Sequence, residues 1–167
     1  MAVFLCGFMG CGKSTIASVL AKYMGCSYCD TDDLIVQKEG MSIPEIFEKK
    51  GESYFRDAEK ELVKELSDYK GVAACGGGLM LNSENYKNAS KNGVVVFLNA
   101  SFETCYERIA GDKNRPVAAS KTKEQLKALF DERYEKYMQN SDFVIDCDSS
   151  PMETAKLILK TISIKKF

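Results

Sequence analysis

Short apolar runs alternate with longer segments of helical periodicity along the chain. Residues 2–6 are uniformly apolar, which suits a buried strand. Residues 13–24 place several apolar side chains on one helical face. Repeated strand–helix units predict an α/β fold, in which helices cover both faces of a parallel sheet. By the same criteria we predict further strands at 26–30, 72–75, 94–98 and 143–146, and helices at 31–39, 43–50, 52–66, 83–90, 102–109, 123–139 and 152–162.

The size and charge of the chain fit one globular domain, 1–167. The chain has 167 residues, of which 45% are hydrophobic and 28% are charged, and no repeat or linker divides it. A formal net charge of -1 gives no support to general binding of nucleic acid or membranes. No apolar run approaches the ~20 residues of a membrane span. The first strand begins almost at Met1, so we expect no leader and a cytoplasmic protein.

Cysteine is frequent in this sequence, whereas histidine is absent. The 7 cysteines are scattered along the chain, and we expect them to be reduced, small core residues. Cys26 and Cys29 form a C-x-x-C pair, but no second metal-binding pair accompanies them, which disfavours zinc or redox function. Without histidine, a general base near neutral pH must be a carboxylate, a lysine, a cysteine or water.

Residues 7–14 read G-F-M-G-C-G-K-S, the P-loop pattern, between a predicted strand and a predicted helix. The glycines let backbone N–H groups turn inward, and the N-terminus of the helix adds partial positive charge. Lys13 can reach the β- and γ-phosphates of a nucleotide, and Ser14 can place its hydroxyl on Mg²⁺. The chain is therefore expected to bind a nucleoside triphosphate.

Two carboxylates stand at the end of the second predicted strand. Asp30 and Asp32 are separated by one residue, so in an extended segment both side chains face the same way. The strand 94–98 is followed by Asn99 and offers no carboxylate, which makes Asp30 the candidate to hold Mg²⁺, in part through water. Asp32 is then left to meet a second substrate. Either residue could also cap the next helix, and capping does not exclude these roles.

Only four of the 23 basic residues are arginine, so each arginine is informative. Planar, bidentate recognition of carboxylate or phosphate is the usual task of arginine, and a surface ion pair is the alternative. Glu59 follows Arg56 by three residues and can orient its guanidinium on a helix. Arg133 shares a helical stripe with apolar residues and needs a buried partner or a ligand. The other two are Arg108 and Arg115.

Three consecutive glycines, 76–78, end the third predicted strand. Such a run is costly in chain entropy and suits a place where backbone approaches a ligand closely; a plain turn is the alternative. Ligands of parallel α/β sheets sit beyond the C-terminal ends of the strands, and all of these motifs fall there.

Together the motifs resemble those of the shikimate kinase family. They are G-F-M-G-C-G-K-S-T, D-T-D, F-R-D-A-E, G-G-G, N-R-P and R-Y-E-K-Y, in that order over essentially the whole chain. The P-loop alone is typical of a superfamily, whereas D-T-D with F-R-x-x-E and G-G-G is far more specific. The resemblance implies a three-layer αβα P-loop NTPase fold of nucleoside-monophosphate-kinase type, with a five-stranded parallel sheet in the order 2-3-1-4-5 and a mobile lid. It implies ATP-dependent phosphorylation of the shikimate 3-hydroxyl, giving shikimate 3-phosphate and ADP, in aromatic amino-acid biosynthesis.

The resemblance also implies a role for each matching residue. The catalytic residues would be Lys13, Asp32 and Arg115, with Arg115 in a lid at about 111–121. Shikimate would be bound by residues on and near helices at about 31–60 and in the glycine run: Asp32, Arg56, Gly77, Gly78 and, farther on, Arg133, with Glu59 keeping Arg56 aimed. The nucleotide would be bound by Gly10, Cys11, Gly12, Lys13, Ser14, Thr15, Arg108, Arg115 and Pro151. Mg²⁺ would be held by Ser14 and Asp30. The partners would be shikimate and ATP, with no nucleic acid and no membrane, in a monomer.

Two positions depart from the common residues of the family. Cys75 precedes the glycines where Ser or Thr is frequent, which removes a hydroxyl but leaves the backbone contacts. Cys11 lies in the P-loop beside a helix N-terminus, where thiolate is favoured. We therefore expect a thiol reagent to inactivate the protein by modifying Cys11, and ATP to protect it.

Other functions remain open at this point. A kinase of the same fold could act on gluconate, which also carries a carboxylate and hydroxyls, or on a nucleoside monophosphate; the combination of D-T-D with F-R-x-x-E favours shikimate. A small GTPase is disfavoured because the D-x-x-G match at 68–71 precedes a strand and no N-K-x-D element appears. No basic stripe supports nucleic-acid binding.

Overall fold

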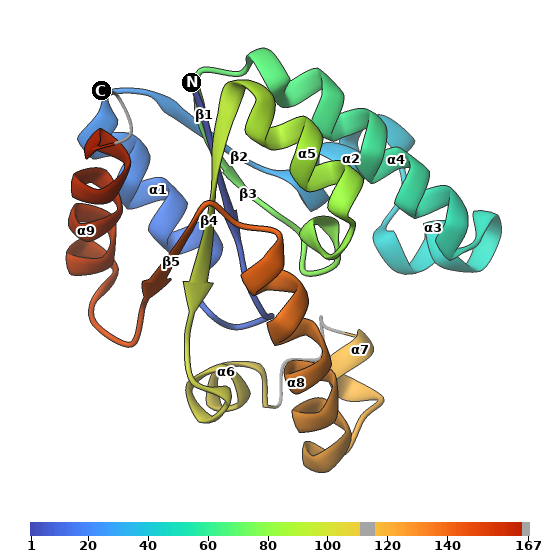
Figure 1. The fold of residues 1–167 in the computed structure, drawn as a ribbon. Coiled ribbons are helices and arrows are strands. Elements are labelled where there is room, and N and C mark those ends of the chain that lie inside the picture. The colour runs from blue at the N-terminus through green and yellow to red at the C-terminus, as the bar shows by residue number, and fades with distance from the viewer. Residues whose placement is uncertain (111–115, 165–167) are drawn as a thin grey trace.

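The computed structural model describes residues 1–110 and 116–164 and contains one parallel sheet in that part of the chain (Figure 1). The sheet has 5 strands in the order β2-β3-β1-β4-β5, and every neighbouring pair is parallel. This confirms the predicted α/β fold and strand order. The strands are β1 (Ala2–Cys6), β2 (Ser27–Asp30), β3 (Gly71–Ala74), β4 (Gly93–Asn99) and β5 (Phe143–Asp146).

Helices cover both faces of the sheet (Figure 1). On one face α1 and α9 pack together, and on the other α5 lies against β4 and β1. In the described residues, no helix is both long and apolar enough to cross a membrane. The α-helices are α1 (Lys13–Met24), α2 (Thr31–Glu39), α3 (Ile43–Lys50), α4 (Glu52–Glu65), α5 (Ser83–Asn92), α6 (Phe102–Ile109), α7 (Pro116–Ala119), α8 (Lys123–Gln139) and α9 (Pro151–Ile164).

Most boundaries agree with the periodicity, with small local differences. The predicted helix 52–66 ends at Glu65 and passes into a 3₁₀ turn, η1 (Leu66–Asp68); a second 3₁₀ turn is η2 (Leu79–Leu81). The short helix α7 lies inside the segment expected to form the lid, of which 111–115 lie outside the described residues.

The central strand β1 sets the position of the loops around it. All of its residues are buried, because it has a strand on each side and helices on each face. Leu5 pairs with Ala74 of β3, which pairs in turn with Asp30 of β2. The carboxyl ends of these three strands therefore lie side by side, and the segments that follow them gather at one edge of the sheet.

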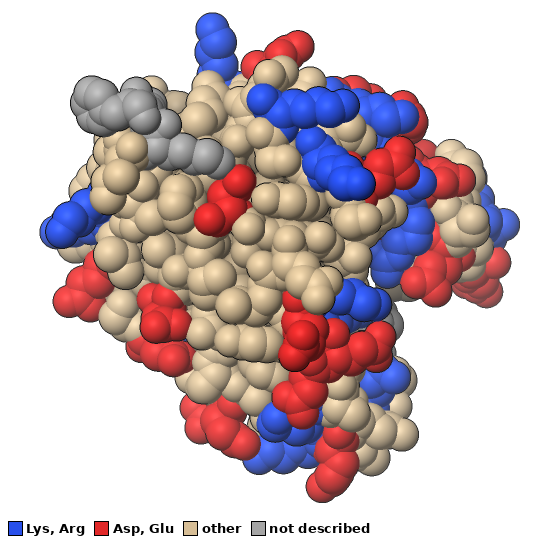
Figure 2. All heavy atoms as spheres, in the orientation of Figure 1, with Lys and Arg blue, Asp and Glu red and all other residues tan. Residues whose placement is uncertain are grey.

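On the face that Figure 2 shows, charged side chains lie mainly around the edge, and the broad central region carries few charges. Around the edge, Lys and Arg side chains lie interspersed with Asp and Glu, as the formal net charge of -1 suggests.

Candidate active site

The P-loop follows β1 and leads into α1. Gly7, Gly10 and Gly12 have φ angles of 148°, 82° and 96°, which side chains rarely allow. A Cβ at Gly10 would stand 2.7 Å from the carbonyl oxygen of Cys105, so the loop packs too closely on α6 for any other residue. Lys13 begins α1 and donates hydrogen bonds to the carbonyls of Gly7, at 2.7 Å, and Phe8, at 3.0 Å. The ammonium group is thus held inside the loop, beside the N-terminus of the helix.

A hydroxyl and a carboxylate meet where α1 begins and β2 ends. The Ser14 hydroxyl donates to Asp30 Oδ2 at 2.9 Å. The other oxygen, Oδ1, caps α2 by accepting from the backbone N–H groups of Asp32, at 2.9 Å, and Asp33, at 3.4 Å. Asp30 therefore caps α2 with one oxygen and accepts a hydrogen bond from Ser14 with the other. Thr15 follows on the exposed side of the first turn of α1.

Ser14 and Asp30 fit Mg²⁺, which prefers oxygen ligands and keeps several water and phosphate oxygens of its own. The described residues contain no group of three or more His, Cys, Asp or Glu side chains that could hold a metal. The described residues therefore do not form a metal site from protein side chains alone. A pair such as Ser14 and Asp30 can bind Mg²⁺ when a bound nucleotide supplies further oxygen ligands.

Each glycine of the run 76–78 packs against one of the predicted acceptor-binding side chains. None of the three has a positive φ, so backbone strain is not the reason for glycine here. A Cβ at Gly76 would overlap the Asp32 carboxylate, and one at Gly78 would overlap the Arg56 guanidinium. At Gly77 a Cβ would lie 3.4 Å from Arg133 Nη1. The run therefore allows the backbone to lie against three functional side chains at once.

Asp32 lies in the first turn of α2, half-buried against this loop. Burial, together with the nearby Asp30 carboxylate, raises the pKa of its carboxyl to about 6 against the attraction of Lys13. The group is still largely ionised at neutral pH and is a stronger base than an exposed aspartate.

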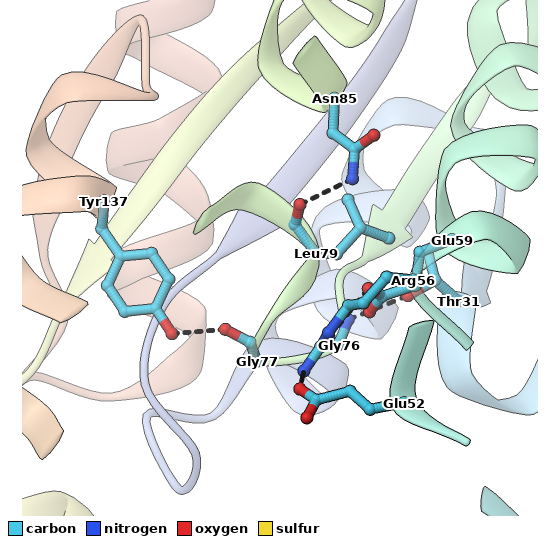
Figure 3. A network of polar contacts seen from close by, with 9 residues as sticks. All are labelled: Thr31, Glu52, Arg56, Glu59, Gly76, Gly77, Leu79, Asn85 and Tyr137. Carbon is cyan, nitrogen blue, oxygen red and sulfur yellow. Dashed lines mark hydrogen bonds and ion pairs between the residues drawn. The ribbon is translucent and has the colours of Figure 1, made fainter. Parts of the chain in front are cut away.

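Arg56 on α4 is held by two carboxylates (Figure 3). Nη1 donates to Glu59 at 2.8 Å and Nη2 donates to Glu52 at 3.2 Å. Glu59 is buried, whereas Glu52 is exposed. Burial raises the pKa of Glu59 to about 7, although Arg56 pulls it down. The predicted contact between Glu59 and Arg56 is present, and the contact with Glu52 was not foreseen.

Arg133 reaches the loop from α8, on the other side from Arg56. It is half-buried, and its charge also lowers the pKa of Glu59 and of Tyr137. Two guanidinium groups and the Asp32 carboxylate thus surround one short stretch of backbone.

Four polar side chains, three on helices and one at the C-cap of α8, hold the glycine loop and the turn after it. Their contacts were not predicted from the sequence. They bond to backbone groups of the loop and the turn, and three of the four contacts are drawn in Figure 3. In the sequence, each of the four is only a polar residue within a predicted helix or directly after one. The structure shows that all four are buried. The pairs are Thr31 with the Gly76 N–H (2.8 Å), Tyr137 with the Gly77 carbonyl (2.6 Å), Asn85 with the Leu79 carbonyl (2.9 Å) and Asn140 with the Met80 carbonyl (2.8 Å).

Of the two described residues predicted to flank adenine, Arg108 contacts the P-loop, whereas no contact with it is seen for Pro151. Arg108 on α6 donates from Nη1 to the carbonyl of Gly10 at 3.1 Å. Pro151 begins α9 and is exposed, and the thiol of Cys147, a few residues earlier, donates to the carbonyl of Cys11 at 3.7 Å. The fourth arginine, Arg115, lies outside the described residues.

Burial of the Cys11 thiol argues against the expectation that a reagent modifies it, which stays a prediction to be tested. The residue is only 1% exposed, and its sulfur lies against Gly7. It lines a small apolar cavity between the P-loop and α8, together with Phe8 and Phe130. The side chain of Cys11 therefore packs in the core, and only its backbone can contribute to the binding surface of the P-loop.

Comparisons with known proteins show the family to which the chain is similar. A family model described as shikimate kinase matches residues 9–163. The shikimate kinase of Persephonella marina is 39% identical over 96% of this chain and 98% of its own length. That of Aquifex aeolicus is 38% identical over 97% of this chain and 96% of its own length.

Solved structures give the same result. A shikimate kinase from Acinetobacter baumannii in complex with shikimate superposes with a TM-score of 0.91 and 33% identity, covering 99% of this chain and 94% of the other. A deoxyadenosine kinase from M. mycoides with bound dATP has a TM-score of 0.65 and 19% identity, covering 98% of this chain and 100% of the other. This second likeness concerns the fold alone.

Proposed function

The chain belongs to the shikimate kinase family, and from this we propose how its residues phosphorylate shikimate. The reaction of the family is ATP-dependent phosphorylation of shikimate in the aromatic amino-acid pathway, with shikimate 3-phosphate and ADP as products. The observation that carries the assignment of roles is the glycine run, which packs against Asp32, Arg133 and Arg56 at once.

The acceptor binds between these three side chains. Arg56 and Arg133 hold its carboxylate, because guanidinium groups recognise a carboxylate through paired hydrogen bonds. Glu59 supports this role by fixing one edge of Arg56 at 2.8 Å. Asp32 accepts from a hydroxyl group of the acceptor, and the backbone of Gly77 and Gly78 completes the site.

The nucleotide binds in the P-loop. Backbone N–H groups of residues 10–15, the N-terminus of α1 and Lys13 surround its phosphates. In phosphoryl transfer the negative charge of the transferred group must be stabilised, so positioned cations and amides do most of the work. Lys13 supplies this charge from the loop, and Arg115 supplies it from a lid at about 111–121 that excludes water. Arg108 and Pro151 flank the adenine.

Ser14 and Asp30 would hold Mg²⁺, and the hydrogen bond of 2.9 Å between them supports this pairing. When bound, the metal neutralises phosphate charge and orients the phosphate chain. Asp32 does the proton work: it aligns the attacking hydroxyl and takes its proton late in the transfer. Its raised pKa suits that task.

A cytoplasmic monomer is the form in which we propose that this protein works. All of its cysteines are free, which fits a reducing compartment.

The test is release of ADP with ATP–Mg²⁺ and one acceptor at a time: shikimate, gluconate, AMP, CMP or none. Turnover with shikimate alone is expected. Turnover with gluconate or a nucleotide in place of shikimate would reassign the acceptor pocket and leave the P-loop assignment standing. A parallel titration with a fluorescent ATP analogue reports nucleotide binding separately from turnover.

A further inference from the structure

The peptide unit between Gly77 and Gly78 is held from one side by a tyrosine. The hydroxyl of Tyr137 donates to the Gly77 carbonyl at 2.6 Å. In a planar trans peptide the carbonyl and the next N–H point in opposite directions. The bond to Tyr137 therefore fixes where the N–H of Gly78 points, which is away from Tyr137.

On that opposite side lies the acceptor pocket. Figure 3 shows the Tyr137 ring on one side of the loop and Arg56 with Glu59 on the other. The guanidinium of Arg56 lies where a Cβ of Gly78 would stand. Among the described residues, the N–H groups of Gly77 and Gly78 donate to no other residue, so both are available to a ligand.

Backbone N–H groups donate to the carbonyls of Gly76 and Gly78, whereas the carbonyl of Gly77 has no backbone donor among the described residues. The Gly76 carbonyl accepts from the N–H of Leu79 at 3.1 Å, and that of Gly78 accepts from Leu81 at 3.2 Å. For the Gly77 carbonyl, the tyrosine hydroxyl is the donor that the described residues provide. Because glycine has no side chain to restrict it, a peptide between two glycines rotates easily once that bond is lost.

Tyr137 itself has a rigid setting. It is 1% exposed, and its ring packs on Phe97 of β4 with centroids 5.2 Å apart. Burial raises the pKa of its hydroxyl, which therefore stays protonated and can donate at neutral pH. Arg133 lies one turn earlier on the same face of α8, so the hydroxyl and the guanidinium are positioned together.

We propose that Tyr137 is a positioning residue: it aims the N–H of Gly78 at an oxygen of the bound acceptor, a carboxylate or hydroxyl oxygen. The inference rests on the proposed function, in which the acceptor lies against Gly77 and Gly78. It adds a residue that touches neither substrate but sets the direction of a donor that does.

Tyr137→Phe tests the proposal, because it removes the hydroxyl and keeps the ring. We expect the KM for shikimate to rise about tenfold, equal to about 1.4 kcal/mol, while kcat falls less than about threefold and the KM for ATP stays the same. The matched control is Tyr134→Phe on the same helix; the Tyr134 ring also packs on Phe97, and its hydroxyl makes no hydrogen bond to the described residues. It should behave as the wild type.

A purely structural role for the hydroxyl would lower the melting temperature without changing the KM for shikimate, and that result would overturn the proposal. A second measurement does not depend on the variant folding. In wild-type protein labelled with ¹⁵N-glycine, shikimate without ATP should shift the amide signal of Gly78, and no shift would also overturn it. If the wild type binds ATP but does not turn over with shikimate, the proposed function fails instead.

Discussion

At the scale of single residues, the proposed acceptor pocket depends on the absence of methyl groups at positions 76 and 78. The carboxylate of Asp32 and the guanidinium of Arg56 occupy the space that side chains at positions 76 and 78 would need. A larger residue at position 76 or 78 would displace the side chain of Asp32 or Arg56. An alanine there would therefore weaken binding by moving that side chain, and not by straining φ, which is not positive at either position.

Asp32→Asn should remove the base and keep the shape of the pocket. We expect kcat to fall by about 10²–10⁴, the usual contribution of general-base catalysis, with the affinity for ATP unchanged. Steady-state turnover and nucleotide titration measure the two effects. Asp33→Asn, at the exposed neighbouring position, is the control. Near-normal turnover of Asp32→Asn would remove this residue from the mechanism.

Glu59 should make stability depend on pH. Burial raises the pKa of Glu59 from 4.5 to about 7, so the folded protein binds this proton more tightly than the unfolded chain. Stability from this group therefore rises as the pH falls from about 7 towards 4.5. Compared with Glu59→Gln, the wild type should gain on the order of 1–2 kcal/mol between pH 8 and 5.5. Denaturant unfolding of both proteins at several pH values measures this, and parallel pH profiles would contradict it.

The candidate site was predictable from sequence where a residue type carries the chemistry. Lys13 and Ser14 follow from the P-loop, and the partnership of Glu59 with Arg56 follows from helical spacing. The bond from Tyr137 to Gly77 was not predictable, because it joins residues 60 positions apart and depends on how α8 crosses the sheet edge. The burial of Cys11 was missed because a motif gives the path of the loop but not the direction of each side chain.

At the scale of secondary structure, one residue joins two elements and a predicted metal site. Asp30 ends β2, caps α2 with one oxygen and faces Ser14 with the other. The cap holds the first turn of α2, which carries Thr31 and Asp32, against the glycine loop. A short acidic motif therefore serves helix formation and also supplies the residues for which we propose the chemistry.

Asp30→Asn should separate these two tasks. Asparagine caps helices as well as aspartate does, so stability should change by less than about 0.5 kcal/mol. The amide lacks the charge that attracts a metal, so the Mg²⁺ concentration for half-maximal activity should rise about tenfold, equal to about 1.4 kcal/mol. Asp33→Asn is again the control. An unchanged Mg²⁺ requirement would show that Asp30 does not hold the metal.

The strands and long helices were predicted to within one or two residues, since each carries a full period of its apolar pattern. The turns η1 and η2 were missed, because 3 residues are too few to show a period. The strand order came from resemblance to a family and not from periodicity, which says nothing about which strands are neighbours.

At the scale of the whole molecule, burial divides the cysteines into two groups. Cys26 and Cys29 are partly exposed, and the other five are buried. Burial also raises the pKa of Cys29, which slows its reaction with a disulfide reagent. Access to the five buried thiols therefore requires the domain to open.

A colorimetric thiol titration of the native protein should find no more than two thiols that react quickly, with the remaining five released by denaturant. ATP–Mg²⁺ should slow the reaction of the five buried thiols only to the extent that its binding stabilises the folded protein. Cys26→Ser with Cys29→Ser should abolish the fast phase and serves as the control. A third fast thiol that ATP protects would restore the idea of a reactive Cys11.

The central place of β1 has a consequence for how the chain is made. This strand is made before its two partners, β3 and β4, at Gly71–Ala74 and Gly93–Asn99. At about 5–20 residues per second, roughly 4 to 14 s pass before β3 is available to pair with it. During that time the five apolar residues of β1 have no partner strand with which to form hydrogen bonds. The strand that leads into the P-loop is thus an apolar segment that a nascent-chain chaperone could bind until β3 has been made.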